Sequence, residues 1–77
     1  MSIGRDQIMY EIVEHLAVID RSDNGWRLEA NIVNWNNSVD KLDLRQWSED
    51  HSRMTRGSTF TKEQAMKLAK VLSDRFL

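Results

Sequence analysis

The sequence predicts an α+β fold in which a four-stranded antiparallel meander is followed by one C-terminal helix. Runs rich in β-branched and aromatic residues are separated by short clusters of Asn, Asp, Gly and Ser, as is typical of hairpin-linked strands. The last part of the chain instead repeats apolar residues at helical spacing. With 77 residues and no cysteine, the chain forms one domain, residues 1–77, whose core alone is marginal. Self-association adds buried area, so we expect a homodimer.

The first strand is expected over residues 10–20, because YEIVEHLAVID contains no turn residue. Asp23, Asn24 and Gly25 follow, and Asn-Gly between two apolar runs is a strong hairpin signal. The return strand is expected over about residues 26–35. A second cluster of turn residues, NNS, then precedes the third strand, which favours an antiparallel meander over a crossover connection.

The second and third strands each have an apolar and a polar face, because side chains alternate along a strand. The third strand is expected over residues 41–47. The apolar positions are Leu28, Ala30, Ile32, Leu42 and Leu44. The opposite positions, interrupted by Val33, carry Arg27, Glu29, Asn31, Trp35, Lys41, Asp43, Arg45 and Trp47. We expect the apolar positions to form a core beneath the helix and the polar positions to face away from it.

A short extended stretch at residues 58–60 is expected as the fourth strand. Thr61 and Gln64 then have the spacing of a capping box, which places the start of the helix. The apolar stripe of this helix consists of Ala65, Leu68, Ala69, Leu72 and Phe76, flanked by Met66 and Val71. The arc is wider than one sheet contact requires, which favours a second helix packing there. The predicted dimer interface is Met66, Ala69, Leu72 and Phe76.

Charge is unevenly distributed along the chain. The net charge is −1, but residues 1–52 contain five Lys or Arg against ten Asp or Glu, whereas residues 53–77 contain six against two. A local positive field results if the fold brings Arg53 and Arg56 close to the cations of the strands. Because there is no signal peptide and no apolar run of membrane-spanning length, we expect a soluble cytoplasmic protein, free or associated with the nucleoid.

The polar face of the predicted sheet has an unusual composition. A solvated face normally carries Thr, Lys, Glu and Ser, whereas Trp35 and Trp47 are large apolar rings. Arg27, Lys41 and Arg45 share their parity. Cations interleaved with rings suit a phosphate backbone with splayed bases, so the face predicts binding of single-stranded nucleic acid. Two alternatives stay open: a homodimeric protein-interaction module that uses the same aromatic face, and single-stranded RNA as the ligand.

The sequence predicts no catalytic centre. Asp50 and His51 lie beside Ser48 and Ser52, but adjacency alone does not supply the geometry of nucleophile, base and orienting group. Two histidines without cysteine do not predict a zinc site, and the three glycines form no phosphate-binding loop. We therefore expect a protein that is not an enzyme and needs no cofactor.

Four motifs, in their order along the chain, carry a family resemblance. They are GWR at residues 25–27, VNWN at residues 33–36, KLDLRQWSEDHSRM at residues 41–54 and RG at residues 56–57. From Tyr10 to about Leu72, the chain resembles the positive-cofactor-four transcriptional coactivators, most closely their bacterial YdbC-like branch of single-stranded-DNA-binding proteins. The resemblance implies a curved sheet, a dimer formed through the helices, and sequence-tolerant binding of single-stranded DNA across the paired sheets. It also implies a role in transcription regulation or in handling exposed strands. It does not identify a partner in the transcription machinery.

The resemblance assigns roles to individual residues. The aspartate-apolar-arginine motif of the family falls on Asp43 to Arg45, with Arg45 as the phosphate or base contact. Trp47 corresponds to the stacking aromatic beyond it, and Trp35 to the aromatic at the preceding turn. The resemblance also matches Trp26 and Arg27 to the pair after the hairpin, Met54 to the loop methionine and Arg56 to the basic residue before a glycine. With Arg53 and the other polar-face positions, the predicted nucleic-acid-binding set is Trp26, Arg27, Asn31, Trp35, Lys41, Arg45, Trp47, Arg53, Met54 and Arg56. Residues 1–7 are expected to form a loose tail.

Overall fold

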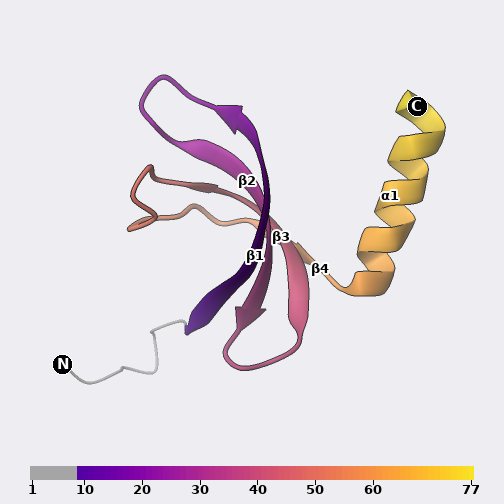
Figure 1. Cartoon of the computed structure of the whole chain (residues 1–77), viewed down its shortest axis with the longest axis horizontal. Coiled ribbons are helices and arrows are strands. Elements are labelled where there is room, and N and C mark those ends of the chain that lie inside the picture. The colour runs from indigo at the N-terminus through magenta and orange to yellow at the C-terminus, as the bar shows by residue number, and fades with distance from the viewer. Residues whose placement is uncertain (1–8) are drawn as a thin grey trace.

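The computed structural model describes residues 9–77 and confirms the predicted fold class (Figure 1). The elements are β1 (Tyr10–Arg21), β2 (Arg27–Trp35), β3 (Asp40–Trp47), β4 (Ser58–Phe60) and α1 (Lys62–Phe76). The strands form one open antiparallel sheet in the order β1-β2-β3-β4, so each strand pairs with its neighbour in sequence. The tail expected at residues 1–7 lies outside the described residues.

Both predicted turns are confirmed. Between β1 and β2, Gly25 has a φ of 89°, a conformation that glycine adopts without steric cost, and the Ser22 amide donates to the Trp26 carbonyl at 2.8 Å. Between β2 and β3, Asn36 and Asn37 have φ values of 53° and 57°. Asparagine tolerates this left-handed region, and two such residues in succession give a turn whose twist matches that of the flanking strands.

Three β-bulges interrupt the pairing of β1 with β2. The register shifts between Ile12 and Glu14, between His15 and Ala17, and between Val18 and Asp20. Each bulge adds one residue to β1 and increases its twist, so the strand bends around the sheet. These bulges also overturn simple alternation in β1: Glu11 and Glu14, which alternation places on opposite faces, lie opposite Asn34 and Ile32, both even-numbered residues of β2.

The buried side chains lie mainly on the face formed by the odd-numbered residues of β2 and β3, here called the odd face. Val33 and Trp47 are fully buried there, together with the polar residues Glu29, Asn31 and Asp43. The opposite, even face is apolar but only half-buried. Its residues Leu28, Ala30, Ile32, Leu42 and Leu44 are all of intermediate exposure. The expectation that the even face forms the core is therefore wrong for the single chain.

Helix α1 begins as predicted. Thr61 is the N-cap; its side chain accepts from the Gln64 amide at 3.1 Å, and the Gln64 side chain accepts from the Thr61 amide at 2.9 Å. The helix contacts β3 and β4 at its first turns and stands away from the rest of the sheet (Figure 1). Within the described chain α1 has no buried residue, so the expected covering of the sheet by its apolar stripe is also wrong for one chain.

The segment 48–57, here called the loop, folds back along β3. The Ser48 amide donates to the Arg53 carbonyl at 2.9 Å, and the Thr55 amide donates to the Gln46 carbonyl at 3.0 Å. Gly57 allows this close approach, because a Cβ atom there would lie 2.6 Å from the Leu44 carbonyl oxygen. The loop therefore covers part of the odd face.

Candidate functional site

Antiparallel pairing places six of the predicted binding residues on the odd face. Arg27 lies opposite Trp47, and Asn31 lies opposite Asp43. Residues directly opposite each other share a face of the sheet. The members of the set on this face are Arg27, Asn31, Trp35, Lys41, Arg45 and Trp47. The alternation of β2 and β3 thus predicted their common side correctly.

Three aromatic rings, of Tyr10, Trp35 and Trp47, form a cluster on the odd face. The Tyr10 ring centroid is 5.5 Å from that of Trp35 and 5.6 Å from that of Trp47. Trp47 is only 1% exposed, whereas Tyr10 is 40% exposed. The Trp47 ring, which was expected to stack on a base, is therefore inaccessible in this conformation. Tyr10 was not among the predicted residues, and it is the most accessible ring of the cluster.

Arg45 joins this cluster and is held firmly. Its Nε and Nη2 atoms each donate to a different carboxylate oxygen of Asp43 at 2.7 Å, and its Nη1 donates to the Thr55 carbonyl at 3.4 Å. The guanidinium carbon lies 4.5 Å from the centroid of the Trp35 ring, within the range of a cation–π contact. Asp43 thus orients Arg45 across Trp35, and one cation and one ring are presented together.

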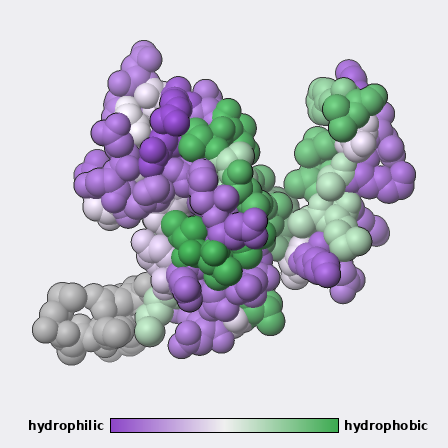
Figure 2. All heavy atoms as spheres, viewed as in Figure 1, coloured by the Kyte–Doolittle hydropathy of each residue, from purple (hydrophilic) through white to green (hydrophobic). Residues whose placement is uncertain are grey.

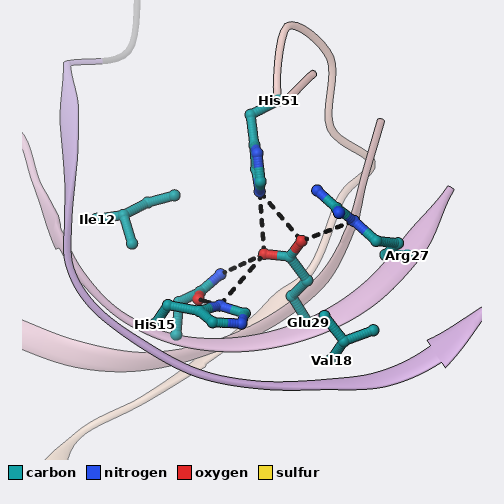
Figure 3. Close-up of a pocket in the computed structure, with 7 residues that line it drawn as sticks. Ile12, His15, Val18, Arg27, Glu29 and His51 are labelled. Atoms are coloured by element: carbon teal, nitrogen blue, oxygen red, sulfur yellow. Dashed lines mark hydrogen bonds and ion pairs between the residues drawn. The ribbon is translucent and has the colours of Figure 1, made fainter. Parts of the chain in front are cut away.

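The second feature of the odd face is a buried carboxylate. Glu29 is 1% exposed, and His51 Nε2 lies 3.1 Å from both of its oxygens (Figure 3). Asn31 Nδ2 donates to Oε1 at 3.1 Å, and Arg27 Nε lies 3.2 Å from Oε2. His15 of β1 is farther away, with Nδ1 at 3.7 Å from Oε1. The cluster therefore joins β1, β2 and the loop.

Burial opposes ionisation of Glu29, but hydrogen bonds from His51 and Asn31 and the charges of His51 and Arg27 outweigh it. The pKa of Glu29 therefore lies below its ordinary value. A carboxylate with a lowered pKa stabilises the fold above its unfolded pKa, and this contribution is lost as the pH falls through the folded pKa.

A hollow of about 260 Å³ opens beside this carboxylate, between β1 and the loop. Ile12 and Val18 form its apolar wall (Figure 3). Within residues 9–77, no group of three or more His, Cys, Asp or Glu side chains is placed to hold a metal ion. Glu29 is fully engaged by its neighbours, so the cluster is suited to holding the loop in place.

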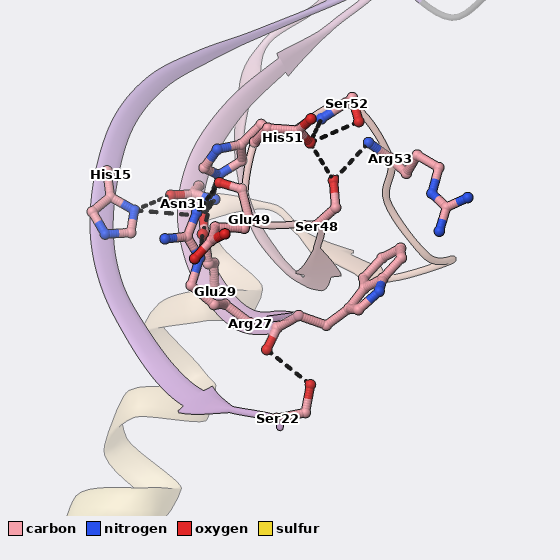
Figure 4. Close-up of polar contacts among 12 residues, drawn as sticks. His15, Ser22, Arg27, Glu29, Asn31, Ser48, Glu49, His51, Ser52 and Arg53 are labelled. Carbon is pink, nitrogen blue, oxygen red and sulfur yellow. Dashed lines mark hydrogen bonds and ion pairs between the residues drawn. The ribbon is translucent and has the colours of Figure 1, made fainter. Parts of the chain in front are cut away.

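The loop itself is organised around Asp50. Hydrogen bonds from the Ser52 hydroxyl and amide and from the Ser48 hydroxyl lower the pKa of Asp50 to about 2. The Ser48 hydroxyl in turn accepts from the Arg53 amide at 3.0 Å (Figure 4). The Arg53 guanidinium carbon lies 5.6 Å from the Trp26 ring centroid, which gives a second pairing of a cation with an indole.

The predicted residues differ in how accessible they are. Arg53 and Arg56 are exposed, and Asn31 and Trp47 are buried. The half-buried members are Trp26, Arg27, Trp35, Lys41, Arg45 and Met54. Eight of the ten predicted residues are therefore at least partly accessible, although the Arg45 side chain is only 11% exposed, and Asn31 and Trp47 are buried.

The fold and the odd face define a small α+β protein with an open four-stranded sheet, one exposed helix and a loop folded across the aromatic side of the sheet. No family model matches the chain. Over 75 residues it is 35% identical to an uncharacterized protein of Treponema pallidum (strain Nichols), and the alignment covers 97% of this chain and 88% of that relative. The chain belongs to the same family as this protein. Within the described residues, no helix has the length and apolar character needed to cross a membrane.

Proposed function

We propose that the protein binds single-stranded DNA with little sequence preference, and that it acts in transcription regulation or in the handling of exposed strands. The observation that supports this proposal best is the pairing of cations with indole rings at two places, Arg45 with Trp35 and Arg53 with Trp26. Proteins that bind single strands without reading sequence combine cations along the backbone path with rings on which bases stack.

The accessible rings set the expected path of the strand. On the odd face Trp35 is half-buried and Tyr10 is exposed, so bases meet these rings rather than the buried Trp47. Trp26 is also half-buried and lies beside the even-numbered Leu28 and Gln46. Arg53 and Arg56 extend the cationic surface along the loop. Because the net charge is −1, few phosphates are neutralised, and we expect a modest dependence of affinity on salt.

Substitution of Trp26 by alanine is expected to weaken binding of a labelled oligo-dT by about 1 to 3 kcal/mol, the usual contribution of one stacked base. Trp26 lies outside the buried core, so the fold should survive. Fluorescence anisotropy measures the affinity, and Lys67→Ala, an exposed cation on α1, is the matched control that should bind like the parent.

The same titration is repeated with duplex DNA and with RNA of equal length. Weak binding of both supports the proposal, whereas tighter binding of RNA would favour the RNA alternative. If the parent does not bind oligo-dT at low salt, or if Trp26→Ala binds as well as the parent, the proposed function is wrong. A protein partner held by apolar contacts would instead show little salt dependence.

We also propose that the protein acts as a homodimer. The apolar side of α1 faces the sheet across open space (Figure 2), and a groove of about 380 Å³ separates them. Ile32, Leu42, Ala65, Met66 and Ala69 are among the residues lining this groove. The helix also exposes Leu72 and Phe76, and the even face is only half-buried. A second chain that inserts its helix here would bury both surfaces, as small domains commonly require.

Sedimentation equilibrium is expected to give twice the 9.1 kDa mass of one chain. Leu72→Glu should shift the protein towards the monomer, because it places a charge in the apolar interface. Lys67→Glu, an exposed position outside the apolar stripe, is the control and should stay dimeric. A parent protein that sediments as a monomer would contradict the dimer.

A further inference from the structure

We propose that Glu29 is a positioning residue that holds the loop against the sheet through His51, and that this latch tightens when His51 is protonated. The latch itself does not depend on DNA binding. Its consequence for affinity rests on the proposed function, because the loop carries Arg53 and Arg56.

The geometry of His51 indicates that its position is imposed by its contacts. Its φ is 61°, a left-handed conformation that is uncommon outside glycine and is maintained by the surroundings. Its Nε2 is equidistant, at 3.1 Å, from the two oxygens of Glu29. The imidazole ring also lies 5.2 Å from the ring of Trp47. One loop residue thus contacts both the buried carboxylate and the buried indole.

The two members of the latch differ in their access to water. The Glu29 side chain is 1% exposed, whereas the His51 side chain is 38% exposed. Protons therefore reach the imidazole without opening of the sheet, and the carboxylate stays fixed beneath it. Glu29 stays ionised, so a proton on His51 adds the attraction between two opposite charges whose atoms lie 3.1 Å apart, and this favours the closed loop.

The other charged groups around Glu29 limit the size of this effect. From β2, Arg27 already pairs with Glu29, and its Nη2 donates to the Glu49 carbonyl of the loop at 3.0 Å. From β1, His15 Nδ1 donates to Asn31 Oδ1 at 2.7 Å and lies farther from the carboxylate. From β3, Arg45 lies opposite Glu29 but is held by Asp43. Arg27 and the His51 latch therefore anchor the loop together.

Between pH 5 and 8, a change in the charge of the loop and its surroundings can be attributed to the histidines. Imidazole is the ordinary side chain that changes charge in this range. Glu29, with its lowered pKa, and Asp50, with a pKa of about 2, stay ionised throughout it. A change in loop order over this range therefore reports His51 or His15, and the two can be separated by substitution.

Amide hydrogen exchange, measured by NMR without DNA, tests the latch. The amides of Ser48, His51 and Arg53 are hydrogen-bonded within the loop. Their protection factors, relative to those of the sheet amides, are expected to be up to about fivefold higher at about pH 5.5 than at about pH 8 in the parent, the usual effect of one partly exposed ion pair. His51→Gln keeps a hydrogen-bond donor but carries no charge, so it should remove this pH dependence. Glu29→Gln should remove it as well, and the double variant should behave like either single variant.

His15→Gln is the matched control and should keep the pH dependence, because His15 lies on β1, bonds Asn31, and lies 3.7 Å from Glu29 against 3.1 Å for His51. The proposal is overturned if loop protection in the parent does not change with pH, if the change persists in His51→Gln, or if it disappears in His15→Gln. Because His51 lies on the partly exposed loop, His51→Gln remains informative even if Glu29→Gln fails to fold.

An oligo-dT titration at the same two pH values tests whether the latch affects DNA affinity. Affinity should be higher at the lower pH in the parent, by a factor similar to that seen in exchange, and should lose this dependence in His51→Gln. If oligo-dT does not bind at all, the proposed function fails while the exchange result still decides the latch. If oligo-dT binds but loop exchange is independent of pH, the latch fails and the proposed function stands.

Discussion

Replacement of Trp47 by alanine is expected to destabilise the protein by about 3 to 5 kcal/mol, the usual cost of removing a large buried aromatic ring. Trp47 is 1% exposed, and its ring lies against those of Tyr10 and His51. Its removal would leave a cavity where β1, β3 and the loop meet. This consequence differs from the role that the family resemblance assigns to Trp47, in which the ring stacks on a base.

Urea unfolding at a fixed protein concentration measures this effect, since a protein that self-associates gains stability with concentration. Trp47→Phe keeps most of the packing and removes an indole N–H that has no hydrogen-bond partner within residues 9–77, so its cost should be much smaller. Trp26→Ala, at the half-buried indole beside Arg53, is the second comparison. Equal losses in Trp47→Ala and Trp26→Ala would show that Trp47 is not a core residue.

Removal of the Asp43 carboxylate is the second large effect. Asp43→Ala is expected to cost about 3 to 5 kcal/mol, because it leaves a largely buried charge without its partner. The Asp43 side chain is fully buried and the Arg45 side chain is 11% exposed, with two hydrogen bonds of 2.7 Å between them. Arg45 would also lose its fixed orientation over Trp35, so oligo-dT affinity should fall in the protein that remains folded.

Two further variants separate the loss of a buried pair from the loss of any ion pair. Asp74→Ala breaks the exposed pair with Lys70 on α1 and should cost less than about 0.5 kcal/mol. Asp43→Ala combined with Arg45→Met removes both charges, and it should recover part of the stability lost in Asp43→Ala. Thermal unfolding of the set at one concentration provides the comparison. A double variant as unstable as Asp43→Ala would argue against an uncompensated guanidinium as the cause.

The fold was predictable from the sequence wherever local chemistry decides the outcome. Asn24 and Gly25 determine the first turn, Asn36 and Asn37 the second, and the capping box at Thr61 the start of α1. The shared side of Arg27, Trp35, Arg45 and Trp47 follows from the alternation of β2 and β3, which the regular pairing of these strands preserves.

The environment of the site was not predictable in the same way. Strict alternation from the Arg21–Arg27 pair would place Tyr10 opposite Ser38, whereas the bulged register places it opposite Trp35. No local signal in β1 marks the bulges, so the aromatic cluster was missed. Burial of Glu29 depends on the loop folding across the sheet, a contact between residues 22 positions apart. The alternation of apolar residues favoured the even face as the core. This pattern carries no information about which face of the sheet a distant loop covers.

The bulges in β1 also affect how the sheet meets other chains. β1 is an edge strand, and Val13, Leu16 and Ile19 are exposed along it. A long regular edge with apolar side chains is a template for strand addition and fibril growth. Because the backbone is interrupted at three places, this edge offers an incoming strand no continuous row of evenly spaced donors and acceptors. The same irregularity that places Tyr10 beside Trp35 on the odd face therefore makes this edge a poor template for strand addition.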